Sequence, residues 1–250
     1  MIAEPLAYGD SFLHRIDPRL RIVVAALFSC SVAVFHALAA LLAACLAALL
    51  LLALSGLDFR QIGRRLAVML GFLLLLWCLL PVTYEGDIVG RVGPLNFYRP
   101  GILLSAQITL KSLAIIAVFT ALVATIPVNT LGQSLARLHV PDKLVYLLLM
   151  CYRYIFVIEQ EYHRLIAAMK IRGFQPRTNL HTYRSYAYLV GMLFVRAASR
   201  ADRVHQAMRC RGFDGRFHSL ATFPVHPLNQ WFAVAAASAM IVLLWMEWFF

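Results

Sequence analysis

Charged residues are scarce in this chain: they make up 14% of its 250 residues, whereas hydrophobic residues make up 62%. Lysine occurs only as Lys111, Lys143 and Lys170, so arginine carries nearly all of the positive charge. A soluble globular domain has about 25% charged residues, and the composition therefore excludes that class and indicates a polytopic membrane protein. Arginine is also the cation best suited to forked pairing with carboxylates or phosphates.

Several sequence motifs of enzymes are missing as well. No GxxxxGK[ST] phosphate loop, nucleophile elbow or HExxH zinc motif occurs. The five cysteines show no CxxC spacing and four of them lie in apolar runs, which predicts small buried residues rather than disulfides or ligands. The histidines form no compact ligand cluster. We expect a chain that is not an enzyme and holds no metal and no cofactor.

Five apolar runs are read as membrane-spanning helices, since about 20 residues cross roughly 30 Å of hydrocarbon. They cover residues 21–35, 37–57, 66–82, 101–126 and 228–248. The first twenty residues lack the apolar core of a signal peptide, so the first run is expected to be retained. The predicted fold class is an all-α membrane protein in three parts: four spans in 1–126, a cytoplasmic domain of two long helices and a short one in 127–227, and a fifth span in 228–250.

Arginine and lysine are distributed unevenly between the two sides of this arrangement. With the N-terminus in the cytoplasm, the inner side collects three in residues 1–21, three in 60–65 and fourteen in 127–227. The outer side collects only Arg91 and Arg99. Because positive charge is retained on the cytoplasmic side, we expect a cytoplasmic N-terminus and a cytoplasmic domain in 127–227.

A basic heptapeptide occurs twice in this domain, as AMKIRGF at 168–174 and AMRCRGF at 207–213. Helical patterns run over about 142–172 and 183–211, after a short helix that ends near residue 139. Each heptapeptide therefore lies in the last turn of a long helix, with its glycine just past the end.

The two copies place a small residue and an arginine four positions apart, on one face of each helix. The residues aligned by the 39-residue offset are Arg164 with Arg203, Ala168 with Ala207, and Arg172 with Arg211. Two equivalent ends predict two equivalent docking partners. The pattern alone is also compatible with interaction with the helix dipole, with binding of anionic lipid, and with chance recurrence.

Three runs carry a resemblance to a known family: HRIDPRLRIVV at 14–24, the run at 141–174, and FVRAASRADRVHQAMRCRGFDGRF at 194–217. The chain resembles the T component of energy-coupling factor (ECF) transporters, the CbiQ/EcfT family, and most closely its cobalt-type branch, CbiQ. In that family two coupling helices end in Ala-Arg-Gly motifs that dock into two ABC-type ATPases. The matching positions here are Ile171, Arg172, Gly173, Cys210, Arg211 and Gly212. Ile171 and Cys210 replace the usual alanine.

The resemblance implies a non-catalytic transducer in the bacterial inner membrane that couples ATP-driven motion to import, most closely of cobalt for cobalamin biosynthesis. The implied partners are two CbiO-like ATPase subunits, a CbiM-like substrate-binding membrane subunit and membrane lipid, with room for a small accessory membrane subunit and no nucleic acid. Nickel or a vitamin such as biotin stays open as the substrate, because selectivity would reside in the partner. A stand-alone channel or secondary carrier is the alternative of another class.

Other residues receive more limited expectations. Asp17 and Arg19 match the family's entry motif, and Asp17 is expected to cap the first span or pair with an arginine. Lys111, inside the fourth span, is either functional or engaged in an interior polar contact. The apolar stretches 144–152 and 188–194 are close to charged residues, so they are expected to contact the substrate-binding partner rather than to cross the membrane.

Overall fold

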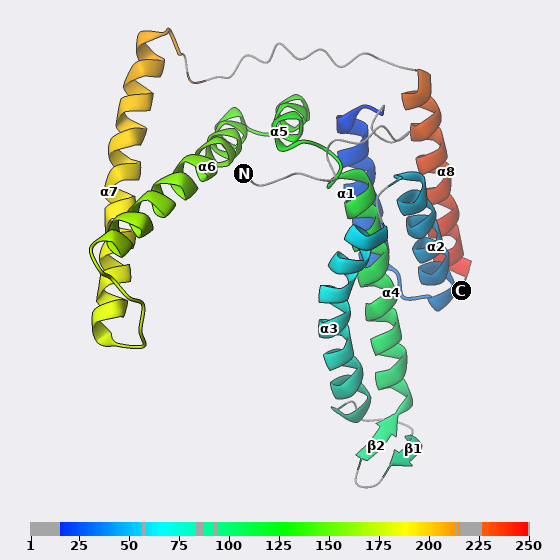
Figure 1. Ribbon diagram of the computed structural model, residues 1–250. Coiled ribbons are helices and arrows are strands. Elements are labelled where there is room, and N and C mark those ends of the chain that lie inside the picture. Colours follow the sequence, from blue (N-terminus) through cyan, green and yellow to red (C-terminus); the bar gives the residue numbers. More distant parts are fainter. Residues whose placement is uncertain are drawn as a thin grey trace. The chain divides into compact units, whose positions relative to one another are not determined.

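The computed structural model describes residues 16–56, 59–83, 88–92, 95–213, 215 and 227–249 (Figure 1). Eight helices and one hairpin are found in these ranges. In chain order they are α1 (Pro18–Val34), α2 (Leu38–Leu54), α3 (Phe59–Thr83), β1 (Ile88–Val92), β2 (Leu95–Tyr98), α4 (Arg99–Leu122), α5 (Val128–Arg137), α6 (Asp142–Ile171), α7 (Leu180–Cys210) and α8 (Pro227–Phe249).

The predicted helices are present, with small shifts at their ends. Each of the five apolar runs forms a helix, and α6 ends within a residue of its expected end. α7 begins at Leu180, three residues before the predicted start at Tyr183. α5 ends at Arg137, and His139 just beyond it has a φ of +62°. The hydrophobic period and the glycines after the long helices thus located these elements well.

The all-α fold class is confirmed, and the described residues add one short hairpin to the helices. Between α3 and α4, strands β1 and β2 pair antiparallel, with Ile88 opposite Tyr98 and Val92 opposite Leu95. This connection also contains glycine and proline residues, which are typical of a loop. Its short runs IVGRV and LNFY contain β-branched and aromatic residues that favour strands, and that preference outweighed the turn signals.

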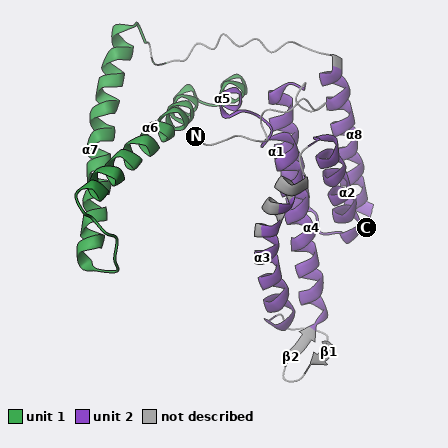
Figure 2. Ribbon diagram, in the orientation of Figure 1, with its two compact units in different colours: residues 1–3, 132–221 green, residues 4–131, 222–250 purple. Residues whose placement is uncertain are grey.

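The chain divides into two compact units, shown in Figure 2. One contains Gly132–Ala221, and with it most of α5 and all of α6 and α7. The other contains Glu4–Leu131 and Thr222–Phe250, and with them α1 to α4, the hairpin and α8. We call them the long-helix unit and the bundle unit. The predicted assignment of the first to the cytoplasm and the second to the membrane stays a prediction.

Small residues form the centre of the bundle unit. Buried alanines recur at helical spacing on α2 and α4, where each is at most 1% exposed: Ala40, Ala44, Ala48, Ala114, Ala117 and Ala121. Small side chains let helix backbones approach closely, which is how membrane helices pack when lipid is as apolar as their side chains. Gly101 serves the same purpose at the start of α4, because a Cβ there would lie 2.5 Å from the Leu80 carbonyl oxygen of α3.

Within the described residues, two helices are long and apolar enough to cross a membrane by themselves, namely α4 and the part of α8 from Leu228 to Phe249. α2 and the Met69–Thr83 part of α3 are apolar but shorter. The number of five spans is therefore neither confirmed nor excluded. The cysteine prediction was partly wrong: Cys45 is buried, whereas the other four cysteines are exposed on this chain.

Candidate functional site

The long helices α6 and α7 have 30 and 31 residues, or roughly 45 Å each at 1.5 Å per residue. The C-terminus of α6 is a Schellman motif. The amide of Phe174 donates to the carbonyl of Met169 at 3.1 Å, and the amide of Gly173 donates to the carbonyl of Lys170 at 3.0 Å. Gly173 has a φ of +77°, which glycine adopts without a steric penalty. The glycine of the first heptapeptide thus closes its helix.

α7 ends in the same way. The amide of Phe213 donates to the carbonyl of Met208 at 3.1 Å, and the amide of Gly212 donates to the carbonyl of Arg209 at 3.0 Å. Gly212 has a φ of +79°. The two heptapeptides also agree residue by residue in exposure, since only the methionine and the phenylalanine of each copy are partly buried. The repeated sequence therefore builds the same helix end twice.

Both motif arginines stand free at these ends. Arg172 and Arg211 are exposed, and neither guanidinium forms a hydrogen bond or ion pair with another described residue. Ile171 is 87% exposed and Cys210 is also exposed. Each end therefore offers an unpaired cation beside a small or medium apolar side chain, which is a chemistry that suits an acidic socket with an apolar wall.

The phenylalanine of each copy packs against the other long helix. The Phe174 ring meets the Tyr186 ring of α7 edge-on, with centroids 5.8 Å apart. The Phe213 ring lies 5.5 Å from the Tyr146 ring near the start of α6. Aromatic pairs at these separations are stabilising beyond their buried area. The turns that carry the arginines are thus fixed to the helix pair rather than free.

One acidic side chain joins α6 to α7. Glu161 accepts a hydrogen bond from Arg196 and lies 3.5 Å from Arg164. The hydrogen bond from Arg196 lowers the pKa of Glu161, and the charges of Arg164 and Arg200 lower it further. The predicted supporting residue Arg164 is thus engaged within its own helix. The remaining supporting residues of the repeat, which are Ala168, Ala207 and Arg203, are exposed.

A groove of about 410 Å³ lies between α6 and α7. Its lining is mainly apolar and includes Met150, Cys151 and Leu193 from the two stretches expected to contact a partner. Glu161 and Arg196 border it. Its volume is in the range of protein sites for small or elongated apolar groups. The groove extends beyond the predicted stretches, and sequence reasoning did not identify its polar border.

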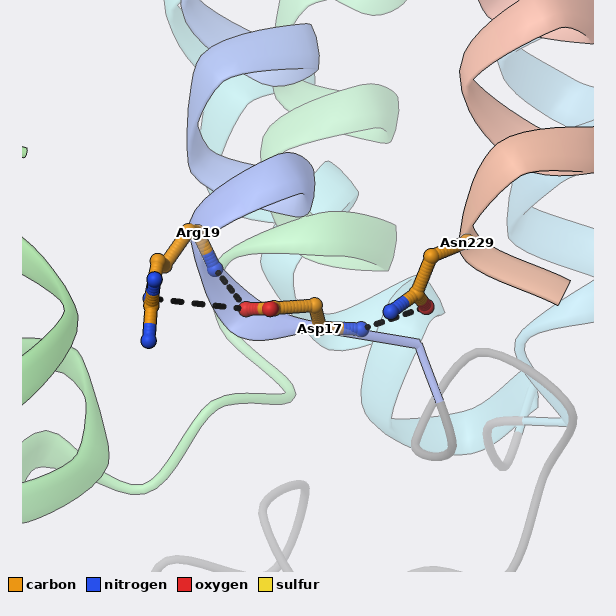
Figure 3. Close-up of polar contacts among 3 residues, drawn as sticks. All are labelled: Asp17, Arg19 and Asn229. Atoms are coloured by element: carbon orange, nitrogen blue, oxygen red, sulfur yellow. Dashed lines mark hydrogen bonds and ion pairs between the residues drawn. The ribbon is translucent and has the colours of Figure 1, made fainter. Parts of the chain in front are cut away.

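Asp17 caps α1, as expected. Its carboxylate accepts from the Arg19 amide at 3.0 Å, and the Arg19 side chain lies 3.9 Å away (Figure 3). The Asp17 amide donates to Oδ1 of Asn229 on α8 at 3.1 Å. Sequence reasoning missed Asn229. Its only signal was that it is a polar residue at the start of an apolar helix, which does not indicate a partner.

Lys111 makes a polar contact inside the bundle unit: its Nζ donates to the carbonyl of Ala33 at 2.9 Å, at the end of α1. Glu247 of α8, which sequence reasoning missed, accepts from the amides of His36 at 2.8 Å and Ala37 at 3.1 Å, at the start of α2. A cation thus meets a helix C-terminus and an anion meets a helix N-terminus, the favourable sense for both dipoles. The geometry supports the structural interpretation of Lys111.

Comparisons with known proteins place most of the chain in one family. The family described as cobalt transport protein, CbiQ, matches residues 9–222. The energy-coupling factor transporter transmembrane protein EcfT of Bacillus subtilis is 25% identical over 226 residues, which are 86% of this chain and 85% of that protein. The cobalt transport protein CbiQ of Rhodobacter capsulatus is 27% identical over 136 residues, 54% of this chain and 55% of that protein. The protein of the same name from Salmonella typhimurium is 28% identical over 130 residues, 51% of this chain and 57% of that protein.

Proposed function

Because the chain belongs to the CbiQ family of cobalt transport proteins, we propose that it is the energy-coupling membrane component of an ECF-type importer. In this role it carries no catalytic centre and transmits the motion of two ATPase subunits to a substrate-binding membrane subunit. The observation that carries the proposal is the pair of equivalent helix ends, each presenting an exposed arginine that has no partner among the described residues. Two copies of one structure suit two copies of one partner.

The docking chemistry follows from these ends. Arg172 and Arg211 each enter an acidic groove of one ATPase subunit and form charge-assisted hydrogen bonds there. The glycine after each arginine leaves the turn without a side chain, and a Cβ at either glycine would meet no atom of the described residues within 4 Å. A partner surface is therefore free to approach the backbone closely.

In this proposal α6 and α7 transmit the motion of the ATPase subunits. When the ATPase subunits close on ATP, the two ends move with them, and the aromatic pairs and the Glu161–Arg196 contact keep each end fixed to the helix pair. The apolar groove between α6 and α7 and its neighbouring stretches contact the substrate-binding subunit. In the proposed arrangement the bundle unit lies in the inner membrane with five spans and a cytoplasmic N-terminus.

The test replaces both arginines, as Arg172→Glu with Arg211→Glu, in a strain that co-produces the ATPase and substrate-binding subunits. Reversed charge in an acidic groove should weaken ATPase co-purification by more than about tenfold for each position and abolish cobalt uptake. The control is Arg153→Glu, which makes the same type of charge change at an exposed position in the interior of α6. Intact ATPase association in the double variant would refute the docking role.

The substrate is tested separately. Uptake of cobalt, nickel and biotin is compared in cells that produce the complete transporter, the transporter without its substrate-binding subunit, and this chain alone. We expect cobalt uptake that requires every subunit. A switch to nickel or biotin would change the substrate and leave the coupling role intact, whereas uptake by the chain alone would identify a secondary carrier or channel.

A further inference from the structure

The segment Gly132–Ala221 of the long-helix unit is joined to the bundle unit at its two ends. One crossing lies between Leu131 and Gly132, within α5, and the other lies in the stretch that precedes α8. Any displacement of this segment that travels along the backbone therefore enters the bundle unit either at the end of α4 or at the start of α8. The contacts that fix these two points within the bundle unit therefore determine how the bundle unit responds to the displacement.

The end of α4 is held by Arg21 of α1. The Arg21 guanidinium donates to Oγ1 of Thr125, which lies three residues after the last residue of α4. The Thr125 hydroxyl in turn donates to the carbonyl of Ala121 at 2.9 Å. Arg21 is 2% exposed and Thr125 is fully buried. The turn that leads from α4 towards α5 is thus fixed by a side chain of another helix.

The start of α8 is held by Asp17, one helical turn before Arg21. The Asp17 amide donates to Oδ1 of Asn229, a buried residue in the first turn of α8 (Figure 3). The Arg21 amide donates to the Asp17 carbonyl at 3.3 Å, so both contacts originate from a single turn of α1. The neighbouring Ile16 is 1% exposed and fixes this turn in the core.

Packing alone does not explain an arginine at position 21. Among the described residues no carboxylate lies within 4 Å of its guanidinium, and its Nε has no hydrogen-bond partner. A well-packed apolar side chain at a buried position is often as stable as an ionic one. The cation instead lies beside the C-terminus of α4, where it meets the negative end of that helix and orients the turn through Thr125.

We infer that the first turn of α1 is the anchor through which the bundle unit receives displacement of the long-helix unit. Arg21 positions the exit from α4, and the backbone of Asp17 positions the entry to α8. Both act as positioning residues. That displacement passes from the long-helix unit to the bundle unit rests on the proposed function. The anchor goes beyond that function because it assigns the transmission to two specific contacts, Arg21–Thr125 and Asp17–Asn229.

The test uses the complete transporter in proteoliposomes, with Thr125→Val and Asn229→Leu to remove the two acceptors. We expect unchanged ATPase association and ATP hydrolysis, and about fivefold less cobalt transported per ATP hydrolysed for each variant. Thr125→Ser and Asn229→Asp keep an acceptor oxygen and should restore the ratio. The matched control is Ser112→Ala on α4, because among the described residues the Ser112 hydroxyl bonds only to the Ile108 carbonyl of its own helix.

The outcomes separate the anchor from the proposed function. If either acceptor variant assembles less well or melts earlier, yet transports as much per ATP as the wild type, the contact is merely structural and the inference fails. Unchanged behaviour in every measurement also overturns it. If the wild-type chain recruits no ATPase, the proposed function fails, and hydrogen exchange on the purified chain still tests the contacts. Faster exchange at residues 123–126 in Thr125→Val would then support the anchor, and unchanged exchange would refute it.

Discussion

The Glu161 carboxylate of α6 accepts a hydrogen bond from the Arg196 guanidinium of α7, so one acidic side chain joins the two long helices. Arg164 adds a second ion pair at 3.5 Å from one turn further along α6. The hydrogen bond from Arg196, with the nearby arginine charges, lowers the pKa of Glu161. The stability of the helix pair should therefore depend on pH in a defined direction.

A carboxyl group whose pKa is lowered by folding stabilises the folded state above its unfolded pKa of about 4.3, and this contribution is lost as the pH falls through the folded pKa. Glu161→Gln should therefore lower the melting temperature of the purified chain at pH 7, and the difference from wild type should shrink at acidic pH. Glu159→Gln on the same helix is the control. A pH-independent difference would show that the contact acts through packing rather than charge.

Gly101→Ala should destabilise the bundle unit by about 1 to 3 kcal/mol, because forcing an atom into a packed interface displaces backbone. The added Cβ would lie 2.5 Å from the Leu80 carbonyl oxygen and 2.8 Å from the Pro81 Cα. Gly71→Ala in α3 is the control, since its Cβ meets nothing within 4 Å and alanine favours the helix. Denaturant titration in detergent micelles measures both. Equal effects would contradict the close contact of α3 with α4.

Substitutions of the heptapeptide glycines distinguish two requirements: the left-handed backbone conformation and the space left for a partner. Alanine strains the left-handed conformation of Gly173 and Gly212 by about 1 kcal/mol, whereas asparagine tolerates it. Both replacements add a Cβ that meets no atom of the described residues within 4 Å. If docking needs close approach of a partner, Gly173→Asn with Gly212→Asn should keep the helix ends and still lose ATPase co-purification.

Gly191→Ala, in the middle of α7 with no atom within 4 Å of the added Cβ, is the matched control and should bind the ATPases normally. Hydrogen exchange at residues 172–174 reports whether the helix end is retained. Normal ATPase binding by the asparagine variant would show that the glycines serve only the backbone conformation.

Lys111→Met should lower the free energy of unfolding by about 1 to 3 kcal/mol, because it removes a charged hydrogen bond to the Ala33 carbonyl. Lys143→Met removes a lysine from an exposed position of α6 and is the control. Denaturant titration in detergent micelles checks both values. Loss of transport with no loss of stability would overturn the structural role of Lys111 and reassign it to function.

The helix ends and the helix cap were predictable because the groups that form them are close together in the chain. The helix ends at Gly173 and Gly212 depend on hydrogen bonds between residues three and five apart in the chain and on one glycine conformation. The heptapeptide contains all of these groups, so reading it twice predicted the same structure twice. The Asp17 cap, which involves a residue two positions away, was predictable for the same reason.

The hairpin of β1 and β2 marks the limit of that reasoning, since pairing between strands decided it. The contacts that organise the bundle unit involve partners far apart in sequence: Arg21 with Thr125, Asp17 with Asn229, and Glu247 with the start of α2. No local pattern distinguishes Asn229 or Glu247 from any polar residue near the end of an apolar helix. The sequence by itself determined which segments are helices and where the cationic ends lie. Only the tertiary structure decided which buried polar groups meet, because each must find its partner on another helix.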